Sequence, residues 1–359
     1  MAKGEFWDFQ QEPVVPGSVY IIGRTEMGRC DQKIRDIISR KIAHIIFINA
    51  AEASETMMGQ FISIGCADLA FSGQLPVIAG GPVDDHVTQF SIEYFLIRLH
   101  DFQENLDVAT RTPEIYTKKP KPYKFLFLNG RIRHHRKWLL EKLRMENLLE
   151  QSLWTCLDQG AAPNRHIRLM DEYGSLMHSP SEIRTLPPQY EYDLYQHNTD
   201  LEFTDPFVKY QLFEQEWGEA YIKPEPYIDT YFSLVTETLF DGNFSFRTEK
   251  IWKPIIMGHP WIAVSSNNFY RDLQGMGFQT FDGIIDESFD GYPDPQARIE
   301  KIYQEVNRLC HSDLDQFLDQ CRDICIYNQA HARKLAADFK KSFARDFLKF
   351  IESIVYARS

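Results

Sequence analysis

The chain lacks the paired cysteines and the long apolar runs that are typical of secreted and membrane proteins. Its 6 cysteines are scattered over 359 residues and form no Cys-x-x-Cys pair, which argues against a disulfide framework and a structural zinc site. No run of about 18 apolar residues occurs, and the first residues hold no apolar segment of secretory-signal length. We therefore expect a cytoplasmic protein.

Positive charge is also scarce. The chain has 39 lysines and arginines against 51 acidic residues, a net charge of -12, whereas affinity for nucleic acid comes mostly from a basic face that neutralises phosphates. The balance predicts no nucleic-acid partner. Hydrophobic residues make up 43% of the chain, enough for sizeable cores, and the length predicts two domains.

Short apolar runs alternate with amphipathic segments in the N-terminal third. The pattern predicts strand, helix, strand, helix and strand over residues 19–23, 31–42, 43–50, 55–71 and 75–81. This alternation is typical of a parallel sheet with covering helices. We predict a further helix over 91–106, which completes an N-terminal α/β domain of residues 1–110.

Residues 111–122 hold three prolines and no hydrophobic period, which predicts a linker. A second α/β domain, 123–335, follows with an apolar strand pattern at its start and a loop-rich stretch over 160–230. The basic, amphipathic segment 336–359 predicts a terminal helix that packs back on the N-terminal domain. A helix lying on a membrane surface is the alternative, which would bring peripheral membrane contact.

The segment "NGRIRHHRK" lies where the first strand of this second domain leads into a helix. It places Arg131, Arg133, Arg136 and Lys137 near the helix start, where the helix dipole is already positive. Backbone amides at a helix start and an arginine side chain suit a phosphate, and strand ends of open α/β sheets line ligand crevices. The segment predicts an anion site. A solvated basic loop, or a nucleic-acid-binding module, are the alternatives.

A second polar cluster occurs in "FRTEKIWKPIIMGHPWIAV". Thr248 is expected to cap a helix that ends at Gly258 before a buried strand. Glu249 suits a helix start electrostatically, whereas Lys250 and Lys253 do not. A carboxylate here can accept from ribose hydroxyls while the lysines face phosphates. The alternative is a capped amphipathic helix with solvated charges.

Together, "FLFLNGRIRHHRKWLLEKL" and "VTETLFDGNFSFRTEKIWKPIIMGHPWIAV" resemble the nucleotide-binding half of the α-1,3-fucosyltransferases. That family has a strand ending in Ser-Asn, an arginine opening the next helix, and a strand ending in Phe-Glu-Asn. A Tyr-x-Thr-Glu-Lys motif then precedes a helix ending in Ala-Gly-x-x-Pro. The matching positions here are Asn129, Arg136, Glu237, Thr248, Glu249, Lys250, Gly258 and Pro260.

The resemblance implies a GT-B fold, with two facing Rossmann-like lobes and the donor nucleotide on the C-terminal one. It implies that Arg136 and Lys250 bind the diphosphate and that Glu249 binds the ribose. The implied reaction transfers a sugar from a nucleotide-sugar donor, such as GDP-fucose, to a glycan, lipid-linked or protein acceptor. The residues assigned to the donor site are Asn129, Arg131, Arg136, Glu237, Thr248, Glu249, Lys250 and Lys253.

We expect the reaction to be inverting. We also expect it to need no metal or other cofactor, because no Asp-x-Asp loop follows a strand and cations can stabilise the leaving diphosphate. An inverting transferase needs a carboxylate that takes the acceptor proton. Glu52 and Glu55, expected after an N-terminal strand, are the first candidates, and Asp84 and Asp85 the second. A protein that binds a nucleotide-sugar without turning it over is the alternative function.

Overall fold

The computed structural model describes residues 13–23, 31–53, 66–81, 87–101, 103–130, 133–156, 186–190, 222–241 and 245–356. Within these ranges the chain is α/β and contains two parallel sheets of four strands each, so the predicted fold class is confirmed at this level. Contacts divide the chain into two units, which are Met1–Tyr94 with Ala337–Ser359, and Phe95–Ala336. None of the helices in the described ranges is both long enough and apolar enough to cross a membrane.

The first unit contains a sheet with strand order β1-β2-β3-β4. Its elements are β1 (Val19–Gly23), α2 (Asp31–Ser39), β2 (His44–Ala53), α4 (Ala67–Phe71), β3 (Val77–Gly80) and β4 (Gln89–Ile92). Alternate residues of β2 face opposite sides of the sheet, as strand geometry requires. Ile45 and Phe47 join one core cluster with α2 and α4, whereas Ile46 joins another with Ile354 near the C-terminus.

Strand β4 corrects the sequence prediction of a helix over 91–106. Ser91 and Ile92 belong to β4, and the helical region is divided into α5 (Tyr94–Asp101) and α6 (Gln103–Val108). Phe90 and Ile92 pack against the cluster that contains Ile78 of β3, and this tertiary contact favours the strand. The N-terminal segment of the first unit ends at Tyr94, before the predicted boundary at residue 110.

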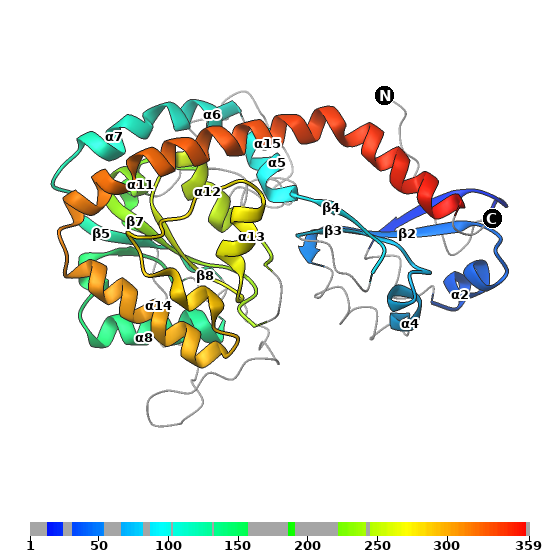
Figure 1. Cartoon of the computed structure of the whole chain (residues 1–359), viewed down its shortest axis with the longest axis horizontal. Helices are drawn as coiled ribbons and strands as arrows, with labels where there is room; N and C mark the ends of the chain where they lie inside the picture. The colour runs from blue at the N-terminus through cyan, green and yellow to red at the C-terminus, as the bar shows by residue number, and fades with distance from the viewer. Residues whose placement is uncertain are drawn as a thin grey trace. The chain divides into compact units, whose positions relative to one another are not determined.

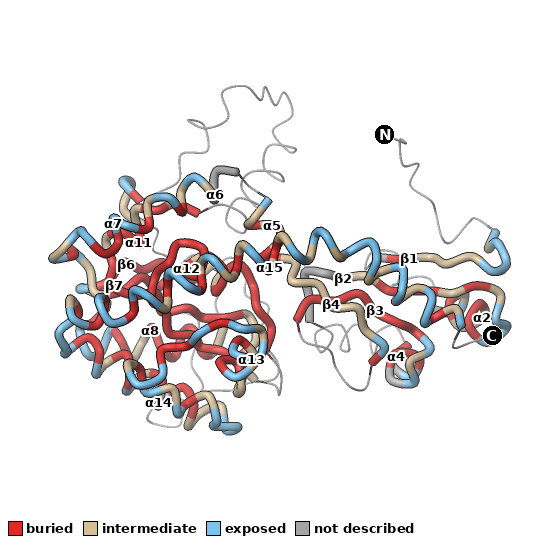
Figure 2. The backbone as a smooth tube through the Cα atoms, turned by 45° about the horizontal axis from the view of Figure 1, so that its top comes forward, coloured by how far each residue is buried: buried red, intermediate tan, exposed pale blue. Residues whose placement is uncertain are grey.

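The second unit contains a sheet with strand order β6-β5-β7-β8. The strands are β5 (Tyr123–Phe127), β6 (Leu153–Trp154), β7 (Thr230–Thr236) and β8 (Trp261–Val264). All seven residues of β7 are buried, as expected of a central parallel strand that is covered on both faces. Figure 2 shows the buried strands together with the mostly buried helix α12 (Glu249–Met257).

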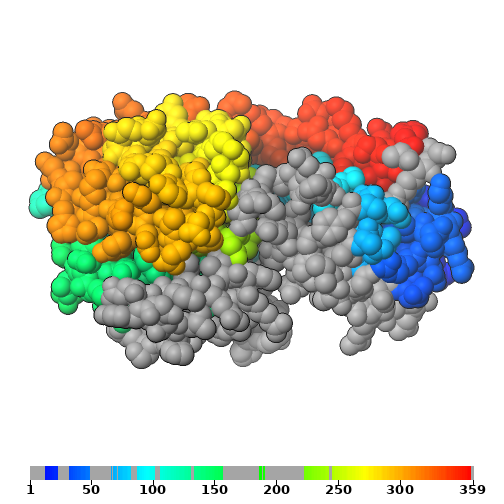
Figure 3. Space-filling view, turned by 60° about the horizontal axis from the view of Figure 1, so that its bottom comes forward, coloured from blue at the N-terminus to red at the C-terminus, as the bar shows by residue number. Residues whose placement is uncertain are grey.

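Helices cover both faces of this second sheet (Figure 1). One side carries α7 (Thr112–Thr117), α11 (Glu225–Ile228), α12 and the first part of α15 (Leu314–Tyr356), and the other carries α8 (His134–Met145) and α14 (Pro295–Cys310). In Figure 3 the segments that hold α13 (Phe269–Gly275) and α14, yellow and orange, form much of one visible face above the green segment of α8. Helix α15 contributes residues to both units.

The predicted linker 111–122 is instead part of the second unit. It contains α7, in which Ile115 and Tyr116 are buried. The Thr112 hydroxyl donates to the carbonyl of Met257 at 2.9 Å, and the Tyr116 hydroxyl donates to the carbonyl of Gly258 at 2.7 Å. These contacts tie α7 to the C-terminal end of α12.

Candidate nucleotide site

The carboxyl ends of β5 and β7 place the two polar motifs side by side. The strands are parallel neighbours, so Asn129 after β5 and Glu237 after β7 lie at the same edge of the sheet. Helices α8 and α12 supply the remaining residues of the two motifs from their first turns. This edge is where open α/β sheets bind ligands.

A buried carboxylate anchors the start of α12. Glu237, with no exposed surface, accepts from the backbone N–H of Thr248 at 3.1 Å and from its hydroxyl at 2.6 Å. The Thr248 hydroxyl oxygen in turn accepts from the backbone N–H of Lys250 at 3.4 Å, so Thr248 caps the helix as predicted. Burial raises the pKa of Glu237, and the nearby Lys250 opposes that change.

Glu249 and Lys250 form an ion pair in the first turn of α12. The Nζ of Lys250 lies 2.5 Å from Oε1 of Glu249 and 3.2 Å from the hydroxyl of Thr248. Burial alone would raise the pKa of Glu249, but Lys250 and Lys253 outweigh it and lower that pKa. Glu249 is therefore an ionised acceptor at neutral pH, next to two cations.

Arg136 is buried in the first turn of α8, where only 4% of its surface is exposed. Its Nη2 donates to the carbonyls of Thr236 at 3.0 Å and Glu237 at 3.2 Å. Burial, with the neighbouring Arg133, lowers the pKa of Arg136 to about 10, which leaves the guanidinium charged at neutral pH. Arg136 thus places a positive charge against the backbone carbonyls at the carboxyl end of β7.

His135 was missed as a site residue by the sequence analysis. Its Nε2 lies 3.0 Å from the carbonyl of Glu237, and its ring stacks on Phe240 at 5.1 Å between centroids. Burial and the charge of Arg136 hold the pKa of His135 well below its usual range, so the ring is neutral and Nε2–H is the donor. Nδ1 is then an acceptor, and within the described residues it has no partner. The sequence offered one indication that His135 belongs to the site, which is that it directly precedes Arg136.

Thr236 joins the two motifs and was also missed. Its hydroxyl donates to Oδ1 of Asn129 at 2.9 Å, and the backbone N–H of Asn129 donates to the hydroxyl of Thr155 at 2.8 Å. Asn129 is 3% exposed, and its Nδ2 has no hydrogen-bond partner in the described part of the chain. No local pattern identifies Thr236, because its partner is 107 positions away.

The structure brings together Asn129, Arg136, Glu237, Thr248, Glu249 and Lys250, and Lys253 lies half-buried later on α12. Arg131 and Glu55 lie outside the described residues, as do Asp84 and Asp85. Glu52 lies within β2 rather than in a loop after it, which corrects the predicted end of that strand, and its side chain is outside the described part.

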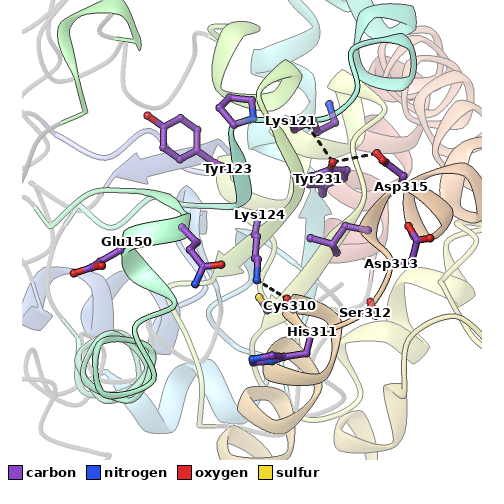
Figure 4. A pocket seen from close by; sticks show the side chains of 13 residues that line it. Lys121, Tyr123, Lys124, Glu150, Tyr231, Cys310, His311, Ser312, Asp313 and Asp315 are labelled. Carbon is purple, nitrogen blue, oxygen red and sulfur yellow. Dashed lines mark hydrogen bonds between the residues drawn. The ribbon is translucent and has the colours of Figure 1, made fainter.

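A cavity of about 660 Å³ lies elsewhere in the second unit (Figure 4). It is lined by Tyr123 at the start of β5 and Tyr231 near the start of β7, together with the turn between α14 and α15. The starts of parallel strands lie at the opposite edge of the sheet from Asn129 and Glu237. The cavity is therefore separate from the polar cluster.

Among the described residues, no group of three or more His, Cys, Asp or Glu side chains is arranged to hold a metal ion. The five described cysteines are buried, and no disulfide joins any two of them. Cys321 and Cys325 are among them, one turn apart on α15, and burial raises the pKa of each thiol.

No protein-family model, curated protein or solved structure matches the chain.

Proposed function

We propose that the protein is a metal-independent, inverting glycosyltransferase that moves a sugar from a nucleotide-sugar donor to a hydroxyl acceptor. The observation that carries the proposal is the polar cluster at the carboxyl edge of β5 and β7. Thr236 bonds Asn129, Arg136 bonds the end of β7, and Glu237 bonds Thr248, so two βα units form one connected group. Ligand crevices of open α/β sheets are built at this location.

The charges of the cluster suit a nucleotide diphosphate. Lys250 and Lys253 on α12 and Arg136 behind β7 supply fixed positive charge, which stabilises a leaving diphosphate as a metal ion otherwise would. The ionised Glu249 supplies an acceptor for ribose hydroxyls. In the proposal, donor binding transfers Lys250 from the Glu249 carboxylate to the phosphates.

The remainder of the proposal follows the resemblance to the α-1,3-fucosyltransferases. In this scheme the two units are the two lobes of a GT-B enzyme, the first unit binds a glycan, lipid-linked or protein acceptor, and Glu52 or Glu55 takes the acceptor proton. GDP-fucose is one donor in this scheme. The described cysteines form no disulfide with one another, which supports a reducing compartment such as the cytoplasm.

The burial of three of the four residues of "HHRK" tells against a nucleic-acid-binding module. His135, Arg136 and Lys137 are 1%, 4% and 6% exposed, so these side chains form no basic surface for a phosphate backbone. A non-catalytic protein that binds a nucleotide-sugar uses the same cluster. Such a protein is distinguished from the enzyme because it binds the donor but neither transfers nor hydrolyses the sugar.

The test begins with thermal shift measurements against GDP, UDP, CMP and dTDP and their sugars, because a ligand that binds only the folded state raises its stability. Lys250→Ala and Glu249→Gln are expected to weaken binding of the active donor about tenfold or more, since each removes a contact to a charged group. Lys349→Ala, at an exposed position of α15, is the matched control and is expected to bind as the parent does. The proposal fails if both site variants bind and turn over the donor like the parent.

A further inference from the structure

The cavity at the amino edge of the second sheet contains a lysine in an unusual setting. Lys121 is 8% exposed and contributes to the cavity wall with Tyr231 (Figure 4). Its Nζ lies 5.8 Å from the centre of the Tyr231 ring, and its backbone N–H donates to the Tyr231 hydroxyl at 3.1 Å. Lys121 is therefore a largely buried lysine that belongs to the lining of the cavity.

The hydrogen bond of Lys121 goes to a neutral group. Nζ donates to the carbonyl of Ile228 at 2.5 Å, and no ion pair joins Lys121 to a carboxylate among the described residues. The nearest acids have other partners, since Asp229 pairs with Lys118 and Asp315 accepts from the Tyr231 hydroxyl at 3.0 Å. A neutral amine still has N–H groups to donate to the Ile228 carbonyl and keeps its lone pair for chemistry.

Burial favours the neutral amine of Lys121. Burial is the largest cause that lowers its pKa to about 7, Lys118 and Lys119 add to this lowering, and Asp229 and Asp315 oppose it. About half of the Lys121 side chains are then unprotonated at pH 7, compared with fewer than about one in a thousand for an ordinary lysine of pKa ~10.4. This lowered pKa accompanies a geometry in which Lys121 lines a cavity and its Nζ donates to one neutral acceptor, the Ile228 carbonyl.

The remaining wall of the cavity selects against anions. Glu150, Asp313 and Asp315 line it, and they offset the single further ammonium, that of Lys124, which donates to the carbonyl of Cys310 at 2.6 Å. The carboxylates of the wall repel an anion, whereas a neutral carbonyl compound is not repelled.

We propose that Lys121 is a nucleophilic lysine and that the cavity accepts a small neutral aldehyde, with which Lys121 forms an imine. The Nζ lone pair attacks the carbonyl carbon and an N–C bond forms. The two amine protons transfer to the carbonyl oxygen, the C–O bond breaks as the C=N bond forms, and the oxygen leaves as water, so that no oxidant or reductant is needed. This activity stands independently of the proposed nucleotide site, which lies at the other edge of the sheet.

The test uses the folded full-length chain with acetaldehyde as the probe and sodium cyanoborohydride as the trap, which reduces the imine to a stable N-ethyl-lysine. Peptide mass spectrometry then gives the labelling rate of each lysine from pH 6 to pH 9. Lys121 is expected to label at least about tenfold faster than Lys124 at pH 7, with a rate midpoint near pH 7. Lys124 is the matched control because it lines the same cavity.

Two further measurements separate this activity from a purely structural lysine. Lys121→Arg is expected to remove the fast label and Lys124→Arg to retain it, and unfolding in urea is expected to abolish the selectivity for Lys121. The proposal is overturned if Lys121 in the folded parent labels no faster than Lys124, or labels only after unfolding. If Lys121→Arg does not fold, the labelling rates of Lys121 and Lys124 in the parent decide between these results.

Discussion

Glu237 accepts hydrogen bonds from both the backbone N–H and the hydroxyl of Thr248, at 3.1 Å and 2.6 Å, across 11 positions of sequence. This pair joins the end of β7 to the start of α12. Because Glu249 and Lys250 directly follow Thr248, the pair also fixes where the charged first turn lies. The stability of the second unit and the geometry of the candidate site therefore depend on one buried carboxylate.

Removal of this carboxylate is expected to destabilise the protein. Glu237→Ala leaves the N–H and hydroxyl of Thr248 without their acceptor, which lowers the free energy of unfolding by about 1–3 kcal/mol for each buried group. Glu237→Gln keeps one acceptor oxygen, so its loss is smaller. Urea unfolding at pH 7 measures both, with Glu300→Ala, exposed on α14, as a control expected within about 0.5 kcal/mol of the parent. Equal losses for the three variants would contradict the anchoring role.

The C-terminal end of α12 gives a second prediction. Gly258 has φ +64°, and a Cβ at this position would lie 2.7 Å from Cγ2 of Thr112. Gly258→Ala therefore combines backbone strain with a steric clash, and we expect a loss of about 1–3 kcal/mol in the free energy of unfolding. Gly275→Ala is the matched control, since a Cβ there meets no atom within 4 Å. The prediction is wrong if thermal unfolding shows the two variants to be equally stable.

Local signals in the sequence were enough to predict the ends of α12. A threonine before Glu249 and a glycine before a strand are capping signals that act within a few residues, and both Thr248 and Gly258 cap the helix in the structure. These features depend on chemistry that is local to each segment. The family resemblance, rather than a local signal, is what predicted Arg136 and Glu237 in one site, and the two residues are in hydrogen-bond contact in the structure.

The features that the sequence analysis missed depend on distant contacts. Strand β6 has two residues, too few for a periodic pattern, and it forms because Leu126 and Phe127 of β5 pair with it. The Lys121 cavity combines residues of β5, β7 and the turn after α14, and nothing near Lys121 in sequence indicates Asp315 or Tyr231. Tertiary contacts of this kind override local propensity.

Stability at acid pH is expected to depend on His259. Its Nε2 lies 2.9 Å from the carbonyl of Thr230 and its Nδ1 lies 3.0 Å from the hydroxyl of Ser233. Burial lowers the pKa of His259 to about 3, so between pH ~6.5 and ~3 the unfolded chain binds a proton that the folded chain does not. Stability therefore falls as the pH falls through this window, by up to about 1.4 kcal/mol per pH unit from this residue.

The replacement His259→Gln isolates this effect. Glutamine retains a donor and an acceptor but binds no proton, so the variant is expected to be less stable than the parent at pH 7 and to lose less stability between pH 6 and pH 4. Urea unfolding across this range measures the difference in slope. Parallel pH profiles for parent and variant would show that His259 is not the residue responsible.

The last part of α15 is expected to stabilise the first unit through an aromatic contact. The rings of Phe347 and Phe90 meet edge to face, with centroids 5.4 Å apart and planes at 71°. Phe347→Ala should lower the stability of this unit by about 1–3 kcal/mol, less than the ~3–5 kcal/mol of a fully buried Phe, because Phe347 is half-buried. Leu348→Ala, at the adjacent position with 60% exposure, should have little effect. Hydrogen exchange distinguishes the two variants. Phe347→Ala alone should speed amide exchange in β2, whereas the amides of β7 should keep their protection. Faster exchange in both strands would instead show that the two units unfold together.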